Sequence, residues 1–189
     1  MDEIEKWRFC FHEGGHSFRA WQLSKLAFRN VVVLSQGQLD GVTNVNPKLL
    51  DQASFEMIAV AGPFAEAKWE ASRTSQRRDF GDLLPLAEKI SNILTNVDAE
   101  PGWKLPVPMI MDAGNEDIKV VFSQEDLRHL LSYKDKTPDE LRDLLYTADE
   151  FLSDDDRWFA ICVIAKALFQ APDGKLSHFM FWLTLRENA

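Results

Sequence analysis

Two histidines and a glutamate near the beginning of the chain have the spacing of a catalytic metal site. His12 and His16 are four residues apart, and Glu13 follows the first of them. Residues four apart on a helix project from the same face, so both imidazoles can bind one metal ion at about 2 Å, the usual distance for zinc. Glu13 then lies beside the pair, where it can accept a proton from a metal-bound water. The pattern predicts zinc-dependent hydrolysis, with Zn²⁺ bound by His12 and His16 and with Glu13 as the catalytic base.

A catalytic zinc ion usually has three protein ligands and a water, so the sequence must supply a third ligand. The remaining histidines are His129 and His178, and each is better explained as a surface or capping residue of a short helix. Carboxylates are the better candidates, and their spacing alone does not choose among them. The carboxylates in question are Glu66, Glu70, Asp79 and Asp82.

The histidine pair requires a helix, and the sequence predicts one from Asp2 to about Leu26. Apolar or small residues at positions 7, 11, 14, 18 and 21 form one stripe, and the two histidines fall on the opposite side of it. The helix is therefore expected to be central, with its histidines facing a cleft or a second layer. Gly14 and Gly15 each destabilise a helix by roughly 0.5–1 kcal/mol relative to alanine, so we expect them to permit close approach by a neighbouring element.

The segments that follow predict a β-hairpin and then further helices. Two β-rich segments, 31–34 and 42–45, flank a short turn. Helices are expected over 55–71 and 82–97, and residues 98–122 are rich in proline and glycine, which is typical of an irregular connection. Further helices are expected to begin at capping residues, which are Ser123 with an acidic first turn, Thr137 with Pro138 and Glu140, Ser153 or Asp154, and Ser177.

We therefore expect a single domain over residues 1–189 that is mainly α with a small β-hairpin or sheet. Its metal-site half would span 1–97, the irregular connection 98–122, and a C-terminal helical half 123–189. The net charge of −9 argues against a nucleic-acid surface, and no apolar run is long enough to span a membrane. Cys10 and Cys162 form no metal-binding pair, and the chain opens with no positively charged signal segment. Two reduced thiols in a cytoplasmic protein are the expectation.

Several segments in a fixed order extend the pattern beyond the histidines. Residues 12–16 read His-Glu-Gly-Gly-His, residues 31–37 contain three valines and a glycine, and residues 41–43 read Gly-Val-Thr. Residues 61–66 read Ala-Gly-Pro-Phe-Ala-Glu, and Asp82-Leu83 follows at the start of a predicted helix. This series resembles the peptidase domain of the FtsH family of zinc proteases over half to two-thirds of the chain. The resemblance implies a zincin-like fold and, since the aspartate of the Asp-Leu pair is the family's third zinc ligand, a zinc site completed by Asp82.

The chain also departs from the family. Pro63 stands within the second helix, Ser35-Gln36 replaces Pro-Arg, and 101–117 resembles an insertion. Since spacing alone does not choose among the carboxylates, Glu66 and Asp79 remain alternatives to Asp82 as the third zinc ligand.

The sequence contains no phosphate-binding motif of an ATPase, Gly-x-x-x-x-Gly-Lys-Ser/Thr. We therefore expect a zinc metallopeptidase that hydrolyses peptides or unfolded protein segments without an ATPase of its own. A separate ATPase or adaptor is a candidate partner. An extended substrate could pair with strand 31–34 or 42–45. The alternative is a zinc-binding interaction or regulatory domain with weak or no hydrolysis.

Overall fold

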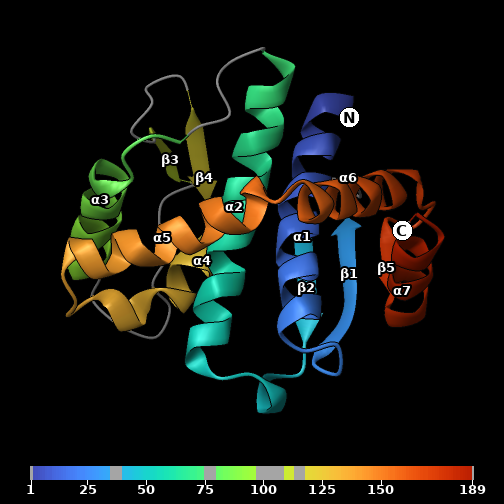
Figure 1. The fold of residues 1–189 in the computed structure, drawn as a ribbon, viewed down its shortest axis with the longest axis horizontal. Helices are drawn as coiled ribbons and strands as arrows, with labels where there is room; N and C mark the ends of the chain where they lie inside the picture. Colours follow the sequence, from blue (N-terminus) through green and yellow to red (C-terminus); the bar gives the residue numbers. More distant parts are fainter. Residues whose placement is uncertain (1, 35–39, 75–79, 97–108, 113–117, 189) are drawn as a thin grey trace.

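The computed structural model describes residues 2–34, 40–74, 80–96, 109–112 and 118–188, and it is mainly helical with a small antiparallel sheet, as expected (Figure 1). The elements in chain order are α1 (Glu3–Leu23), β1 (Phe28–Leu34), β2 (Asp40–Val45), η1 (Pro47–Leu49), α2 (Gln52–Arg73), α3 (Leu84–Thr95), β3 (Met109–Asp112), β4 (Lys119–Phe122), α4 (Gln124–His129), η2 (Leu131–Tyr133), α5 (Pro138–Ser153), α6 (Asp155–Gln170), β5 (Lys175–Ser177) and α7 (His178–Glu187).

Helix α1 lies at the centre of the molecule, as the two-sided apolar pattern predicted. It packs against α2, α6 and the strands β1 and β2 (Figure 1). The contact with α2 depends on Gly15, where an added Cβ would lie 2.5 Å from the carbonyl oxygen of Ala61. At Gly14 an added Cβ would lie 3.5 Å from a side-chain carbon of Ile161, an ordinary contact distance. The predicted close approach is therefore confirmed for Gly15 and is looser at Gly14.

The predicted hairpin is present, and a third strand extends it. β1 pairs antiparallel with β2, with Val31 opposite Thr43 and Val33 opposite Gly41. On its other side β1 pairs with β5, which brings the C-terminal part of the chain back to the N-terminal half. The three residues of β5 are too few for alternation to reveal a strand in the sequence. The predicted turn at 35–38 lies outside the described residues.

Residues 98–122 are not irregular throughout, and this corrects the prediction. β3 and β4 form an antiparallel pair in which Ile110 lies opposite Val121. β4 packs on α2, with Val120 and Phe122 buried, and leads directly into α4. Residues 119–122 are too few for alternation of polar and apolar residues to indicate a strand, and the prolines and glycines before them favour a loop.

The helical half follows its capping residues. Ser123 and Asp126 form a reciprocal capping box at α4, Thr137 and Glu140 form another at α5, and the Asp154 side chain caps α6. α5 packs on α2 and α3, and α6 packs across α1 (Figure 1).

Two further expectations concern the thiols and membranes. Among the described residues, Cys10 and Cys162 form no disulfide bond. None of the helices in the described ranges has the length and apolar character that a membrane span requires.

Candidate metal centre

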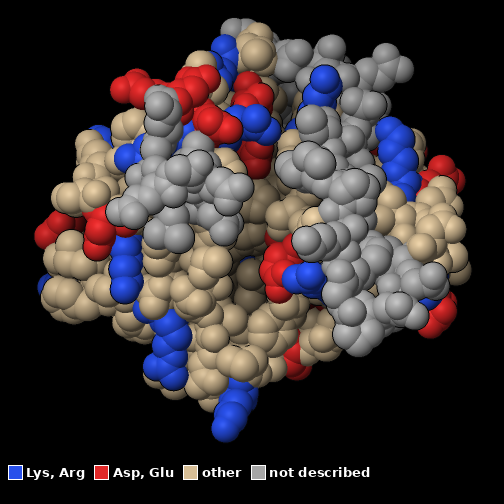
Figure 2. All heavy atoms as spheres, turned by 180° about the vertical axis from the view of Figure 1, so that it is seen from behind, with Lys and Arg blue, Asp and Glu red and all other residues tan. Residues whose placement is uncertain are grey.

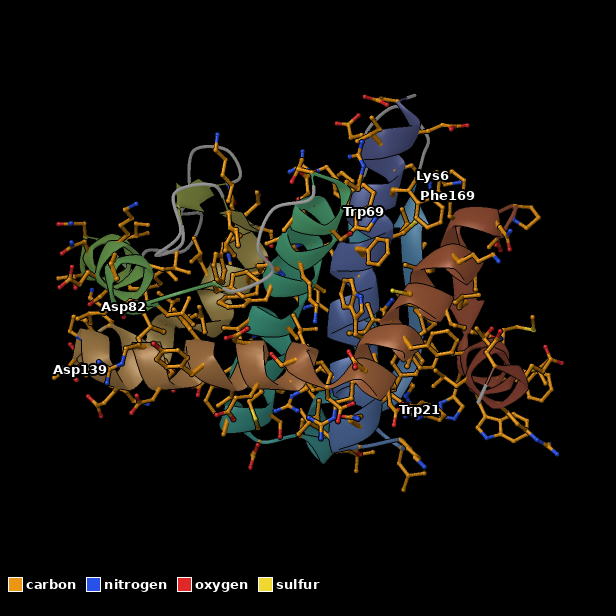
Figure 3. All side chains as sticks on the ribbon, turned by 45° about the horizontal axis from the view of Figure 1, so that its top comes forward. Lys6, Trp21, Trp69, Asp82, Asp139 and Phe169 are labelled. Carbon is orange, nitrogen blue, oxygen red and sulfur yellow. The ribbon has the colours of Figure 1, made fainter. Side chains whose placement is uncertain are left out.

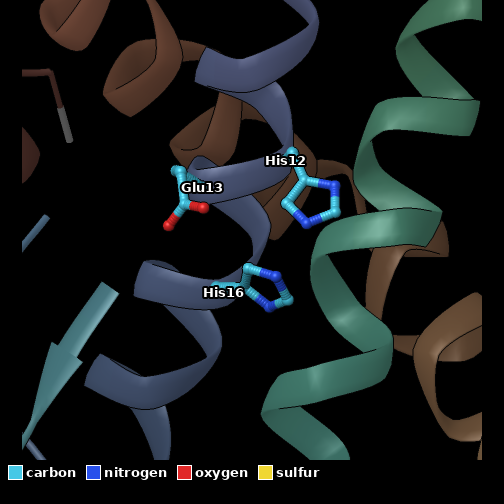
Figure 4. Close-up of side chains that lie close together, drawn as sticks. All are labelled: His12, Glu13 and His16. Atoms are coloured by element: carbon cyan, nitrogen blue, oxygen red, sulfur yellow. The ribbon is translucent and has the colours of Figure 1, made fainter. Parts of the chain in front are cut away.

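His12, Glu13 and His16 come together on the buried face of α1 (Figure 4). One potential ligand atom from each lies within 4.8 Å of the others, and the three residues are only 5–8 % exposed. The two imidazole rings meet edge to face, with their centroids 4.6 Å apart. This is the arrangement expected from the spacing of four residues on a helix. The group could hold a metal ion.

Asp126, at the beginning of α4, brings a carboxylate to both histidines. Its Oδ1 lies 3.1 Å from Nε2 of His16, and its Oδ2 lies 3.5 Å from Nε2 of His12. Neighbouring ligand atoms of a tetrahedral zinc ion with bonds of 2.0–2.1 Å are separated by about 3.3 Å. The two separations are close to those between ligands of one tetrahedral metal ion, and each involves a different oxygen of Asp126.

The capping box of α4 orients this carboxylate. The backbone N–H of Ser123 donates to Oδ2 of Asp126 at 2.8 Å, while the backbone N–H of Asp126 donates to Oγ of Ser123 at 3.1 Å. Asp126 is 4 % exposed, so it cannot turn away to bulk water. The same residue thus begins a helix and faces the two imidazoles.

The far nitrogen of each imidazole is also engaged. Nδ1 of His16 donates to the carbonyl oxygen of Ile58 at 2.7 Å, because a carbonyl can only accept. Nδ1 of His12 lies 3.0 Å from Oε2 of Glu66. With a proton on Nδ1, the neutral imidazole leaves Nε2 free to bind a metal. Both histidines are therefore oriented with Nε2 toward Asp126.

Two further contacts involve α2. Arg8, on α1, donates to Oε1 of Glu66 from Nη2 at 2.7 Å and from Nε at 3.0 Å. The ring of His16 lies directly against Gly62, where an added Cβ would overlap with the imidazole. The sequence-predicted alternative Glu66 is thus a partner of a histidine in the outer sphere of the site. Carboxylates in that place increase the basicity of the ligand and fix its tautomer.

The charged forms of His12, Asp126 and Glu66 stabilise one another. Burial disfavours a charged imidazole, but the hydrogen bonds and negative charges of Asp126 and Glu66 outweigh it, so the pKa of His12 lies well above its ordinary value. Burial also disfavours ionised carboxylates. The charges and hydrogen bonds of His16 and His12 nevertheless lower the pKa of Asp126, and His12 and Arg8 lower that of Glu66. Ion pairing therefore outweighs burial at these three side chains.

Glu13 points to the side of the ligand set, toward strand β2. Its Oε2 accepts a hydrogen bond of 2.7 Å from the hydroxyl of Thr43. Burial raises the pKa of Glu13, and the positive charges of His16 and His12 and the Thr43 hydrogen bond act in the opposite direction. A carboxylate with a raised pKa is suited to accept and return a proton near neutral pH.

The cluster lines a cavity of about 600 Å³ between α1, α2, β2 and the β4–α4 segment. Seen from behind, the molecule is hollowed near the centre of this face (Figure 2). The apolar side chains around the cavity include Phe9, Val42, Ile58 and Val121. Val42 is 47 % exposed, so the wall formed by β2 is accessible.

The structure does not bring Asp82, the ligand implied by the FtsH resemblance, to the histidines. Asp82 is exposed before α3, where its Oδ1 accepts a hydrogen bond from the backbone of Leu84 at 3.0 Å (Figure 3). Within the described residues, it belongs neither to the metal-ligand group nor to the wall of the cavity. Asp79 lies outside the described residues. Glu70 lies 3.0 Å from Nε of Arg8 and is half exposed.

The other two histidines take structural positions. His129 stacks on Phe55 with ring centroids 5.3 Å apart, at the margin of the cavity. Nδ1 of His178 lies 3.0 Å from the carbonyl oxygen of Phe28. Neither joins the His12 and His16 group.

Asp126 was missed, although the sequence carries a signal for it. An Asp-Leu pair at the start of a helix occurs twice, as Asp82-Leu83 and as Asp126-Leu127. Only the first has the family's spacing from residues 61–66. The second follows the unrecognised β3–β4 pair, so its closeness to the histidines could not be inferred from distance along the chain.

Comparison with known proteins adds no family assignment. No family model matches the chain, and no curated protein matches it significantly. The residues and geometry of the candidate metal centre are therefore the basis for inferring a function.

Proposed function

We propose that this chain is a zinc metallopeptidase that hydrolyses peptide bonds in peptides or unfolded protein segments. The observation that carries the proposal is the convergence of His12, His16 and Asp126 at separations of 3.1 and 3.5 Å, with Glu13 beside them. Two histidines and one carboxylate are a common protein ligand set of catalytic zinc, which keeps its fourth position for water or substrate. We also propose, as part of the same hypothesis, the zincin-like character and the relation to the FtsH-type peptidase domain. The order of α1, the β1–β2 hairpin and α2 supports that relation.

The roles of the residues follow from their positions. His12, His16 and Asp126 would hold the ion, and Glu66 and Ile58 would orient the two imidazoles through Nδ1. The bound ion would polarise the scissile carbonyl and acidify a water molecule. Glu13 would take a proton from that water and pass it to the leaving amine. With Asp126 as a ligand and Glu66 bound to His12, Glu13 is the carboxylate of the cluster that would serve as the base.

Strand β2 supports an extended substrate in this proposal. Within the described part of the chain, β2 is paired with β1 on one side and lies at the edge of its sheet. Residues 41–43 of this strand line the cavity next to Glu13. An extended peptide added along such an edge is bound mainly by its backbone, which suits unfolded segments of varied sequence. A separate ATPase or adaptor that presents such segments remains a candidate partner.

The test combines metal content with turnover. The metal-free wild type and Glu13→Gln are each offered equal amounts of Zn²⁺ and Fe²⁺, the bound zinc and iron are measured by mass spectrometry, and both proteins are incubated with a fluorescent unstructured protein. We expect about one zinc per chain in both proteins. We expect cleavage by the wild type and a kcat lower by roughly 10²–10⁴-fold in Glu13→Gln.

Three outcomes would overturn parts of the proposal. Zinc binding without cleavage by the wild type would favour the binding or regulatory domain. Selective uptake of iron would replace the metal assignment, since two histidines and a carboxylate also bind iron. Full activity of Glu13→Gln would remove its role as the base.

A further inference from the structure

Thr43 and Gly41, both on strand β2, enclose the carboxylate of Glu13. The hydroxyl of Thr43 donates to Oε2 of Glu13 at 2.7 Å, because an ionised carboxylate can only accept. The same hydroxyl oxygen lies 3.4 Å from the backbone carbonyl of Glu13, a longer contact. Thr43 therefore contacts both the side chain and the backbone of one residue on α1.

Gly41 allows the strand to lie directly against this side chain. Residues two apart on a strand face the same side, so Gly41 and Thr43 face Glu13 together. A Cβ added at Gly41 would lie 2.5 Å from both Cγ and Oε1 of Glu13. Such a distance requires the carboxylate to move. One oxygen of Glu13 is thus hydrogen-bonded to Thr43, while the other lies against Gly41.

The register of the sheet sets the position of these two residues. Thr43 lies opposite Val31 and Gly41 lies opposite Val33, and both valines are at most 1 % exposed. A shift of β2 by one residue would turn Thr43 away from Glu13. The branched Cβ of threonine also restricts its side chain to few rotamers. The hydroxyl is therefore placed by the core of the protein.

We propose that Thr43 is a positioning residue for Glu13, the general base. This inference rests on the proposed peptidase function. Glu13 has several rotamers available, and the hydroxyl of Thr43 selects the one beside the metal ligands while leaving the second carboxylate oxygen to take the proton. Thr43 keeps its own proton throughout.

The experiment compares Thr43→Val with Thr43→Ser in zinc-loaded protein. Valine keeps the shape of threonine without the hydroxyl, whereas serine keeps the hydroxyl. We expect Thr43→Val to retain zinc and a KM within about threefold of the wild type, with kcat reduced at least tenfold. Thr43→Ser should recover most of that loss. Thr147→Val is the matched control, because it removes a hydroxyl that donates to the carbonyl of Leu144 at 2.7 Å in α5.

A second pair of variants reaches the same carboxylate without changing Thr43. Gly41→Ala should displace Glu13 and reduce kcat while zinc is retained. Gly14→Ala, which adds a Cβ at an ordinary distance of 3.5 Å from its neighbour, should leave kcat unchanged. This pair also decides the question if Thr43→Val fails to fold.

A measurement without turnover tests the contact itself. Urea unfolding of the metal-free wild type, Thr43→Val, Glu13→Ala and the double variant should give non-additive shifts of the midpoint, because alanine removes the acceptor of the Thr43 hydrogen bond. Additive shifts, an unchanged kcat in Thr43→Val, or an equal loss in Thr43→Ser would each overturn the inference. A wild type that binds zinc but does not cleave would refute the proposed function. An active wild type whose kcat is unchanged by Thr43→Val would refute only the inference about Thr43.

Discussion

The two sides of the candidate metal centre are built in different ways. On one side, α1 supplies His12 and His16 through helical periodicity within five residues of sequence. On the other side, α4 supplies Asp126 from more than a hundred residues later, through a helix start that follows β4. The first side is a local property of the chain, whereas the second exists only because the β3–β4 pair and α4 pack on α2. A motif can therefore be read from a sequence while the ligand that completes it cannot.

The largest effect is expected from removing the carboxylate that α4 supplies. Asp126→Ala should weaken zinc binding by more than about 100-fold, since the loss of an outer-sphere partner alone weakens it 10–100-fold. Asp82→Ala is the matched control, because Asp82 is exposed and bonded to its own helix. Competition with a chelating dye measures both affinities. Loss of zinc in Asp82→Ala with retention in Asp126→Ala would restore the assignment derived from the FtsH resemblance.

Acid should weaken zinc binding through the histidines of α1. Zinc must displace the proton of His12, whose pKa is raised by Asp126 and Glu66 against the effect of burial. Below that raised pKa, each unit of pH should lower the affinity by about tenfold for this one proton. Titration calorimetry at pH 7 in two buffers of different ionisation enthalpy should show proton release. Equal heats in both buffers would contradict a protonated His12 in the metal-free protein.

A smaller effect is expected from the outer sphere. Glu66→Gln should weaken zinc binding by about tenfold, at the lower end of the range for such partners, because the amide still reaches His12 but carries no charge. Glu70→Gln is the control, since Glu70 contacts Arg8 but is half exposed. If the two variants bind zinc equally well, the contact between Glu66 and His12 contributes nothing to the metal centre.

The smallest effect concerns the metal-free protein. Because the pKa of His12 is higher in the folded protein than in the unfolded chain, protonated His12 stabilises the fold. This stabilisation is complete below about pH 6.5, the pKa of an unfolded histidine, and is lost as pH rises through the folded pKa. The lowered pKa values of Asp126 and Glu66 stabilise the fold above about 4, and this stability is lost as pH falls. The raised pKa of Glu13 also removes stability as pH rises. Urea unfolding should therefore show a decline in stability toward alkaline pH, and His12→Gln should reduce that decline.

Much of the fold could be predicted because its signals are local. The apolar stripe of α1, the valines of β1 and the capping residues of α4, α5 and α6 act within a few residues of themselves. The short strands β3, β4 and β5 were not foreseen, since their pairing partners decide them more than their own few residues. The missed β3–β4 pair is also the reason that α4 was not placed beside α1.

The sequence by itself determined the reacting face, because a spacing of four on a helix places His12 and His16 over one point and Glu13 beside them. Only the tertiary structure decided what meets that face. Asp126, and not Asp82, lies beside the two imidazoles. Glu66 contacts Nδ1 of His12, and the hydroxyl of Thr43 donates to the carboxylate of Glu13. The physical reason is that covalent spacing sets directions within a helix, whereas contacts between helices and strands depend on how their buried faces pack.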